Sequence, residues 1–277
     1  MWKNMLLLFM VLLLSGCTPV TKAQSLTPTE AESATQVPEA APDAAPDTAL
    51  EEAWQEEQIL DEFQTGEWLD VSLGPPLIEW YNDIARPNDI ARVEHVSQVD
   101  LLDEVNVGRK LVIFKSASDA ERLVPRLVSK IDIIGYNLEH GPTNPADEQA
   151  SPVESAKRMR VLADKYGLEL ALGPDHGFAL SDAAAMAPYV DIIVLQVQRA
   201  QTDHETVREF VLPLAQDIRA ANPDIELSVQ VRTEGDVVAI TELIDSMRDE
   251  LDGISILTSP ETTDVAEALV EELRPAD

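Results

Sequence analysis

From about residue 64, short apolar runs alternate with longer stretches in which apolar residues recur at helical spacing. The short runs predict strands and the longer stretches predict helices. The first two strands have the least regular pattern. The predicted strands are 67–73, 92–99, 110–116, 131–139, 168–175, 191–198, 226–234 and 253–259.

Residues that favour helix ends separate these strands. Ser151-Pro152-Val153-Glu154 has the form of a capping box with proline at the first helical position, and Gly167 is placed to end that helix. Asn222-Pro223 predicts the end of the next long helix. Ser259-Pro260-Glu261 predicts the start of the last one.

Strand and helix alternating in this way predict a parallel sheet with helical crossovers, an α/β fold. Eight such units form a (β/α)8 TIM barrel. We predict this barrel over residues 51–277, with a short lead-in helix within residues 51–63. Its first strands could be incomplete or irregular. An open, doubly wound sheet is the alternative.

Three of the strands share a one-sided polarity that favours the closed barrel. Each has one fully apolar face, which must meet helices, and a second face that becomes polar toward its carboxyl end. A barrel interior explains this pattern, because barrel active sites lie at the carboxyl ends of the strands. Asp175, followed by His176, ends another strand at the same level. The polar residues of the three strands are Asn137, Glu139, Gln196, Gln198, Gln230, Arg232 and Glu234.

The amino-terminal region predicts export and anchoring. Lys3 precedes an apolar run over residues 5–14, which is too short to span a bilayer and is typical of a signal peptide, predicted here as residues 1–16. Cys17, the only cysteine, ends an LSGC tetrad that resembles the lipobox of bacterial lipoproteins. The resemblance implies acylation of Cys17 and a lipid-anchored, extracytoplasmic protein of the bacterial envelope. An ordinary signal peptide with a chance cysteine is the alternative.

Composition describes the segment that follows and limits the partners. Residues 17–50 contain no aromatic residue and no glycine and are rich in Ala, Thr, Pro and Glu, so we predict a disordered tether. The net charge is −31, with 51 acidic and 20 basic residues. This charge argues against nucleic acid and against direct contact with anionic lipid. We therefore expect membrane contact through the lipid alone.

The fourth predicted strand resembles that of the family 18 glycoside hydrolases, which include chitinases and endo-β-N-acetylglucosaminidases. Their D-x-x-D-x-D-x-E motif places its first aspartate on Asp132 and its acid on Glu139, whereas Gly135 and Asn137 stand at the middle aspartates. YGLELALGPD resembles the family's fifth strand. APYVDIIVLQVQ resembles the segment that leads into the family's sixth-strand Q-x-Y-N motif, with Gln196 at the position of its glutamine.

This resemblance implies a sugar-hydrolysing barrel in which Glu139 is the general acid. Asn137 would orient an acetamido group, as the Asn-x-Glu pair of a related endoglycosidase family does. An apolar interior around Glu139 would keep the acid protonated. We expect no metal and no cofactor. The residues predicted to bind the saccharide are Asp175, Gln196, Gln198, Gln230 and Arg232.

Other schemes remain open. Glu139 could act as acid/base with Glu234 as nucleophile, and a separation of about 5 Å would then retain configuration. A metal site could use Glu139, His140, Asp175 and His176, although the histidines lack HxH or HExxH spacing. Acidic turns after the last two strands argue against a phosphate site. Arg232 could simply form an ion pair with Glu139 or Glu234.

A non-catalytic lipoprotein that binds a saccharide or another envelope component is the main rival. The turns look short except for residues 141–150, and the tryptophans that could stack on sugars all precede the better strands. Trp80 and Tyr81 could form such a platform or belong to the core.

Overall fold

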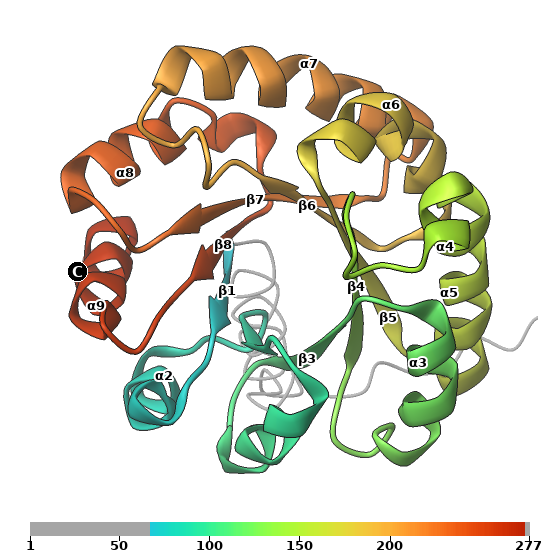
Figure 1. The fold of residues 1–277 in the computed structure, drawn as a ribbon. Helices are drawn as coiled ribbons and strands as arrows, with labels where there is room; N and C mark the ends of the chain where they lie inside the picture. The colour runs from blue at the N-terminus through green and yellow to red at the C-terminus, as the bar shows by residue number, and fades with distance from the viewer. Residues whose placement is uncertain (1–66, 275–277) are drawn as a thin grey trace, which may run out of the picture. The chain divides into compact units, whose positions relative to one another are not determined.

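A computed structural model describes residues 67–274. Eight strands pair in parallel and in chain order, and the last pairs with the first to close the barrel (Figure 1). The TIM barrel is therefore confirmed, first strands included. The predicted signal peptide, Cys17, tether and lead-in helix lie outside the described residues. The strands are β1 (Trp68–Ser72), β2 (Ile90–Val93), β3 (Arg109–Phe114), β4 (Ile133–Leu138), β5 (Glu169–Pro174), β6 (Ile192–Gln196), β7 (Glu226–Arg232) and β8 (Gly253–Leu257).

Helices surround the strands on the outside of the ring (Figure 1). Within the described residues none is long and apolar enough to cross a membrane. The α-helices are α2 (Ile78–Ile84), α3 (Ala117–Leu123), α4 (Ala146–Ala150), α5 (Pro152–Tyr166), α6 (His176–Met186), α7 (His204–Ala221), α8 (Val237–Asp245) and α9 (Thr263–Leu273). The 3-10 helices are η1 (Pro75–Leu77), η2 (Val96–Glu104), η3 (Val124–Arg126), η4 (Ala187–Tyr189) and η5 (Arg248–Glu250).

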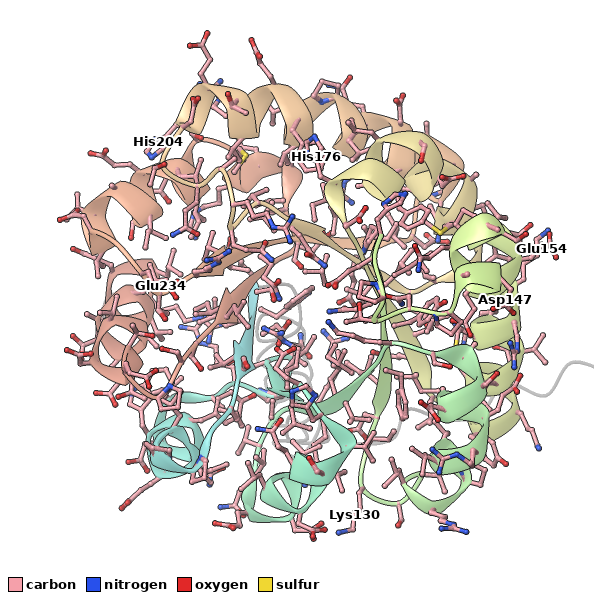
Figure 2. All side chains as sticks on the ribbon, in the orientation of Figure 1. Lys130, Asp147, Glu154, His176, His204 and Glu234 are labelled. Atoms are coloured by element: carbon pink, nitrogen blue, oxygen red, sulfur yellow. The ribbon has the colours of Figure 1, made fainter. Side chains whose placement is uncertain are left out.

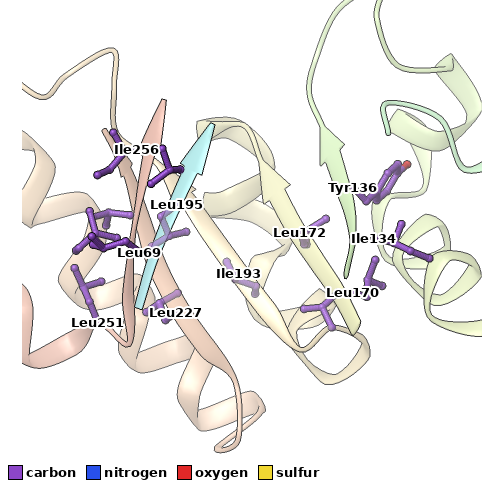
Figure 3. Packing of buried hydrophobic residues seen from close by; sticks show 14 of the residues in the cluster. Leu69, Ile134, Tyr136, Leu170, Leu172, Ile193, Leu195, Leu227, Leu251 and Ile256 are labelled. Carbon is purple, nitrogen blue, oxygen red and sulfur yellow. The ribbon is translucent and has the colours of Figure 1, made fainter. Parts of the chain in front are cut away.

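The core has two apolar layers, one outside the strands and one inside the barrel. Ile134 and Tyr136 of β4 and Ile193 of β6 belong to the outer layer, which packs between strands and helices (Figure 3). Ile192 and Val194, which alternate with Ile193, belong to the inner layer. The predicted assignment of faces is thus confirmed for these strands, as period-two alternation requires.

Charged and aromatic side chains close the amino-terminal end of the barrel. The Arg109 guanidinium lies 3.0 Å from a carboxylate oxygen of Glu169 and 3.0 Å from one of Glu226, which begin β5 and β7. Its central carbon also lies 5.6 Å from the ring centre of Trp68 on β1. A ligand must therefore approach from the opposite end, where the strands finish.

Two boundary predictions were wrong. The second strand is Ile90–Val93, and the rest of its predicted range enters η2, because His95 and Gln98 cap that helix reciprocally. The predicted start of α5 at Pro152 is correct, but the Ser151 side chain before it forms no capping hydrogen bond. The last helix begins at Thr263, since Thr262 first closes a turn onto the Ser259 carbonyl, 3.0 Å from its N–H.

Two predicted helix ends are confirmed. Gly167 follows α5 in the left-handed conformation, with φ of 66°, where a side chain would be strained. Asn222 caps the carboxyl end of α7, and its side-chain amide donates to the Ala187 carbonyl 3.0 Å away.

Candidate functional site

A chain of amide side chains crosses the carboxyl ends of β6 and β7. Gln198 Nε2 donates to Gln196 Oε1 at 3.3 Å and to Gln230 Oε1 at 3.1 Å. Gln230 Nε2 lies 3.4 Å from Ser255 Oγ on β8, and Gln196 Nε2 donates to the Gly173 carbonyl at 3.1 Å. The structure thus brings together three predicted ligand-binding residues. Sequence alternation places all three on the inward face, where they interrupt apolar runs.

A small cavity lies in the barrel just below these amides. Its volume is about 20 Å³, and a single water needs about 10–15 Å³, so it has room for a water but not for a sugar ring. We call it the central cavity. Its lining residues come from seven strands, and the polar ones are Asp70, Arg92, Asn137, Gln196 and Gln230.

Asn137 is the polar group of the central cavity that is left unengaged. Its side chain is half-buried, and within residues 67–274 its amide makes no hydrogen bond. Gly173 on β5 makes room for it, because a Cβ at that position would lie 2.4 Å from Asn137 Oδ1. The amide is therefore available to a ligand or water at the mouth.

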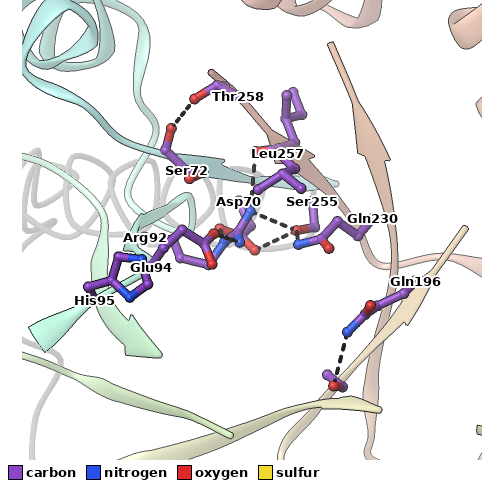
Figure 4. Close-up of polar contacts among 12 residues, drawn as sticks. Asp70, Ser72, Arg92, Glu94, His95, Gln196, Gln230, Ser255, Leu257 and Thr258 are labelled. Carbon is purple, nitrogen blue, oxygen red and sulfur yellow. Dashed lines mark hydrogen bonds and ion pairs between the residues drawn. The ribbon is translucent and has the colours of Figure 1, made fainter. Parts of the chain in front are cut away.

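A buried ion pair forms the other wall of the central cavity (Figure 4). Arg92 Nε donates to Asp70 Oδ1 at 2.8 Å, and Ser255 Oγ donates to Asp70 Oδ2 at 2.7 Å. Arg92 also pairs with Glu94. Burial raises the pKa of the Asp70 carboxyl, although the guanidinium of Arg92 and the hydroxyl of Ser255 oppose the rise. These contacts tie β1 to β2 and β8.

Glu139 lies beyond the end of β4 in surroundings that differ from the predicted apolar interior. Its side chain is 26% exposed, and the Lys115 ammonium lies 3.3 Å from Oε2. Its backbone N–H donates to Asn144 Oδ1, and the Asn144 amide also donates to the Asn137 carbonyl at 2.7 Å. The carboxylate is thus a fixed, ion-paired group at the rim of the mouth.

The two motif positions that depart from family 18 differ in the space they have. At Gly135 the inward space is occupied, because a Cβ there would lie 2.5 Å from Ile113 Cδ1 and 2.8 Å from Leu111 Cδ2. An aspartate at this position would clash. Asn137, by contrast, has space and a free amide.

Asp175 follows β5 and fastens two segments of the mouth. It accepts from the His140 N–H at 2.6 Å, from His140 Nδ1 at 2.8 Å and from the Phe178 N–H at 3.0 Å. Burial would raise the pKa of Asp175, but these hydrogen bonds from His140 and Phe178 outweigh it and lower the pKa. The His140 ring stacks on Phe178 with centres 3.9 Å apart.

A larger cavity opens beside the amide chain, between the ends of β5 and β6 and the start of α7. Its volume is about 320 Å³, within the range of small-molecule sites. We call it the outer cavity. Gln196 lines both cavities, so they adjoin. Its lining residues are Asp175, His176, Gln196, Val197, Gln198, Arg199, Ala200, Thr206, Val207 and Phe210.

Arg232 and Glu234 line neither cavity. Arg232 ends β7 half-buried, and its side chain forms no ion pair with any residue in 67–274, neither with Glu139 nor with Glu234. Glu234 is exposed and lies in the turn between β7 and α8 (Figure 2). The Gln201 side chain fixes this turn by donating to the carbonyls of Arg232 and Glu234, both at 3.1 Å.

Several residues of the mouth escaped the sequence analysis. Arg199 and Phe210 lie in a turn and a helix, where strand alternation carries no signal. Asp70 and Arg92 do interrupt strand patterns, but in the two least regular strands. Gln201 and Asn144 act from loops. No three His, Cys, Asp or Glu side chains of residues 67–274 are grouped to hold a metal ion.

No protein-family model matches the chain, and no curated protein matches it. Tryptophan synthase from M. tuberculosis is similar in structure, with a TM-score of 0.52 at 10% identity over 78% of this chain and 95% of that one. Phosphoribosylanthranilate isomerase from Thermotoga maritima is also similar, with a TM-score of 0.50 at 9% identity. The match covers 76% of this chain and 100% of the isomerase chain.

The glycoside hydrolase domain of PgaB (BpsB) from Bordetella bronchiseptica is a distant structural neighbour, with a TM-score of 0.49 at 9% identity. The match covers 76% of this chain and 99% of that domain. A likeness at that level carries no argument about activity. The solved structures show the TIM-barrel fold, which hosts many unrelated reactions. The resemblance to family 18 stays a prediction from the sequence.

Proposed function

We propose that the mouth of the barrel binds a saccharide in the outer cavity. The amide chain carries this proposal, because Gln196 and Gln198 line the cavity beside an apolar wall. An amide both donates and accepts hydrogen bonds, as a sugar hydroxyl does. The apolar wall of Val197, Val207 and Phe210 suits the C–H face of a sugar ring.

A glycan array with neutral, N-acetylated and acidic members tests the proposal on the full-length chain. We expect selective binding that Gln198→Ala weakens on the order of tenfold, since a buried hydrogen-bonding partner is lost. Gln216→Ala, at an exposed glutamine of α7, is the matched control and keeps full affinity. Absence of binding across the array overturns the proposal.

Glycoside hydrolysis with Glu139 as general acid is a second candidate. The position of Glu139 favours it, two residues beyond the free Asn137 amide at the end of β4. The ion pair with Lys115 and the exposed position of Glu234 favour binding without turnover. Binding is therefore the first proposal and hydrolysis the second.

Turnover of a chromogenic β-N-acetylglucosaminide separates the two candidates. If hydrolysis occurs, Glu139→Gln reduces it by at least about a hundredfold, as loss of a general acid does. Glu154→Gln, at an exposed glutamate of α5, is the control (Figure 2). Retained binding with no turnover in wild type and variants assigns the protein to the binding class.

We also propose that Cys17 carries the lipid that anchors the protein outside the cytoplasm. The LSGC tetrad after an apolar run supports this. Labelled palmitate supplied to a bacterial host should enter the wild type and not Cys17→Ser, which should leave the membrane fraction. Equal labelling of both proteins would refute the anchor.

A further inference from the structure

The outer cavity contains one charged side chain without a partner. Arg199, in the turn after β6, forms no ion pair, hydrogen bond or ring contact with any residue in 67–274. The chain carries 51 acidic residues, and acidic side chains engage most of the described arginines. Arg199 is exposed at the wall of the outer cavity, so its guanidinium is available to a ligand there.

The acidic group of the same cavity is already satisfied. Asp175 accepts three hydrogen bonds at 2.6–3.0 Å from His140 and Phe178, so its oxygens are directed to the protein. His176, which also lines the cavity, faces Phe210 with ring centres 4.2 Å apart. Arg199 is thus the charge in the lining that remains for a ligand.

The rest of the lining determines what such a ligand must offer. Val197, Val207 and Phe210 present an apolar surface, and Gln196 and Gln198 present amides. Arg232, likewise unpaired among the described residues, ends the neighbouring strand β7. The cavity therefore combines a site for an anion, hydrogen-bonding groups for hydroxyls and a wall for a ring.

We infer that the outer cavity takes an acidic sugar, with the carboxylate of a uronic acid against Arg199. The planar guanidinium fork matches a carboxylate and binds it with two parallel hydrogen bonds. This inference rests on the proposed saccharide binding and specifies its substrate class. It also gives the free arginine a role in a protein whose net charge of −31 repels anions elsewhere.

Calorimetry on the full-length chain tests this with glucose, glucuronate and glucose 6-phosphate. We expect glucuronate to bind on the order of tenfold more tightly than glucose. Arg199→Ala should remove that preference, so that glucuronate and glucose bind with equal affinity, and Arg199→Lys should restore part of it. Arg208→Ala, at an exposed and unpaired arginine of α7 outside the outer cavity, is the matched control.

The outcomes separate this inference from the proposal on which it rests. Equal affinity for glucose and glucuronate, or a preference that survives Arg199→Ala, overturns the acidic-sugar assignment and leaves saccharide binding intact. Tighter binding of glucose 6-phosphate overturns the carboxylate in favour of a phosphate. Failure of all three sugars, and of the glycan array, overturns the proposed function itself.

Discussion

Asp175 links two segments of the mouth through one carboxylate. It receives the backbone N–H and the ring nitrogen of His140, from the segment after β4, and the N–H of Phe178, in the first turn of α6. It is also the residue that precedes α6 and caps its amino end. Because all of these groups donate to a charged acceptor, the contribution of Asp175 depends on its ionisation.

Asp175→Ala should lower the free energy of unfolding by about 1–2 kcal/mol at pH 7, the usual cost of a lost amino-terminal cap. The lowered pKa means that the unfolded chain binds the proton more readily than the folded one. The stabilisation is therefore full above the unfolded pKa of about 4 and disappears as pH falls below it. Urea unfolding at pH 7 and at about pH 3 measures the difference.

Asp175→Asn is the control for that prediction, because asparagine keeps the capping oxygen without the charge. We expect it to lose less stability than Asp175→Ala at pH 7. A deficit in Asp175→Ala that stays constant as pH falls would contradict the role of the ionised carboxylate.

At the level of strands and helices, the sequence predicts most elements because alternation and helix-end residues act locally. The apolar faces of β4, β6 and β7 follow from the period-two spacing of their residues. The end of α5 follows from Gly167, which takes the left-handed backbone conformation. The range 92–99 also alternates, yet residues 96–104 form η2, since the His95–Gln98 capping pair stabilises a turn there. Local hydrogen bonds outweighed strand periodicity at that point.

The site was predictable only where it lies on strands. Gln196 and Gln230 interrupt apolar alternation and were found in this way, and the structure joins them through Gln198. Arg199 and Phe210 are separated by one loop and half a helix, and nothing in their spacing indicates a shared cavity. A cavity arises from tertiary packing, which single-sequence periodicity does not report.

Gly253, the first residue of β8, is required by the tryptophan beside it. It pairs with Trp68 across the seam that closes the barrel, and a Cβ there would lie 2.2–2.4 Å from three atoms of the Trp68 ring. That ring is buried on the barrel floor. Gly253→Ala should therefore lower the free energy of unfolding by about 1–3 kcal/mol, the cost of overpacking.

Gly74→Ala is the matched control, because Gly74 has φ of −118° and a Cβ added there would meet only Pro76 Cδ at 3.7 Å. The free energy of unfolding of Gly74→Ala should differ from that of the wild type by no more than about 0.5 kcal/mol. Thermal and urea unfolding of the two variants make the comparison. Equal stability of Gly253→Ala and the wild type would show that Trp68 can move away.

At the scale of the whole molecule, polar contacts span the point where the barrel closes. Arg92 of β2 bonds Asp70 of β1 at 2.8 Å and the Ile256 carbonyl of β8 at 3.2 Å, and Ser255 of β8 also bonds Asp70 (Figure 4). The side chains of Asp70 and Arg92 are each only 2% exposed. The network thus joins the first two strands to the last, and it supports the floor of the mouth.

Arg92→Met should lower the free energy of unfolding by about 3–5 kcal/mol at pH 7, because it leaves Asp70 charged and buried without a cation. Burial raises the pKa of Asp70 in the folded state above its unfolded value, so the stability that this carboxyl contributes is lost as pH rises through the folded pKa. The deficit should therefore shrink as pH is lowered from 7 to about 4. Adding Asp70→Asn should recover part of the loss at pH 7, since the buried charge is then absent.

Lys130→Met serves as the control for this network, because Lys130 pairs with Asp100 and Asp103 at the exposed surface. Its stability should change little, since water screens such pairs. Urea unfolding at several pH values measures all four proteins. If Arg92→Met lost no more stability than Lys130→Met, or if Asp70→Asn made it worse, the closing strands would be held by apolar packing alone. The mouth would then owe its shape to the two core layers rather than to the buried ion pair.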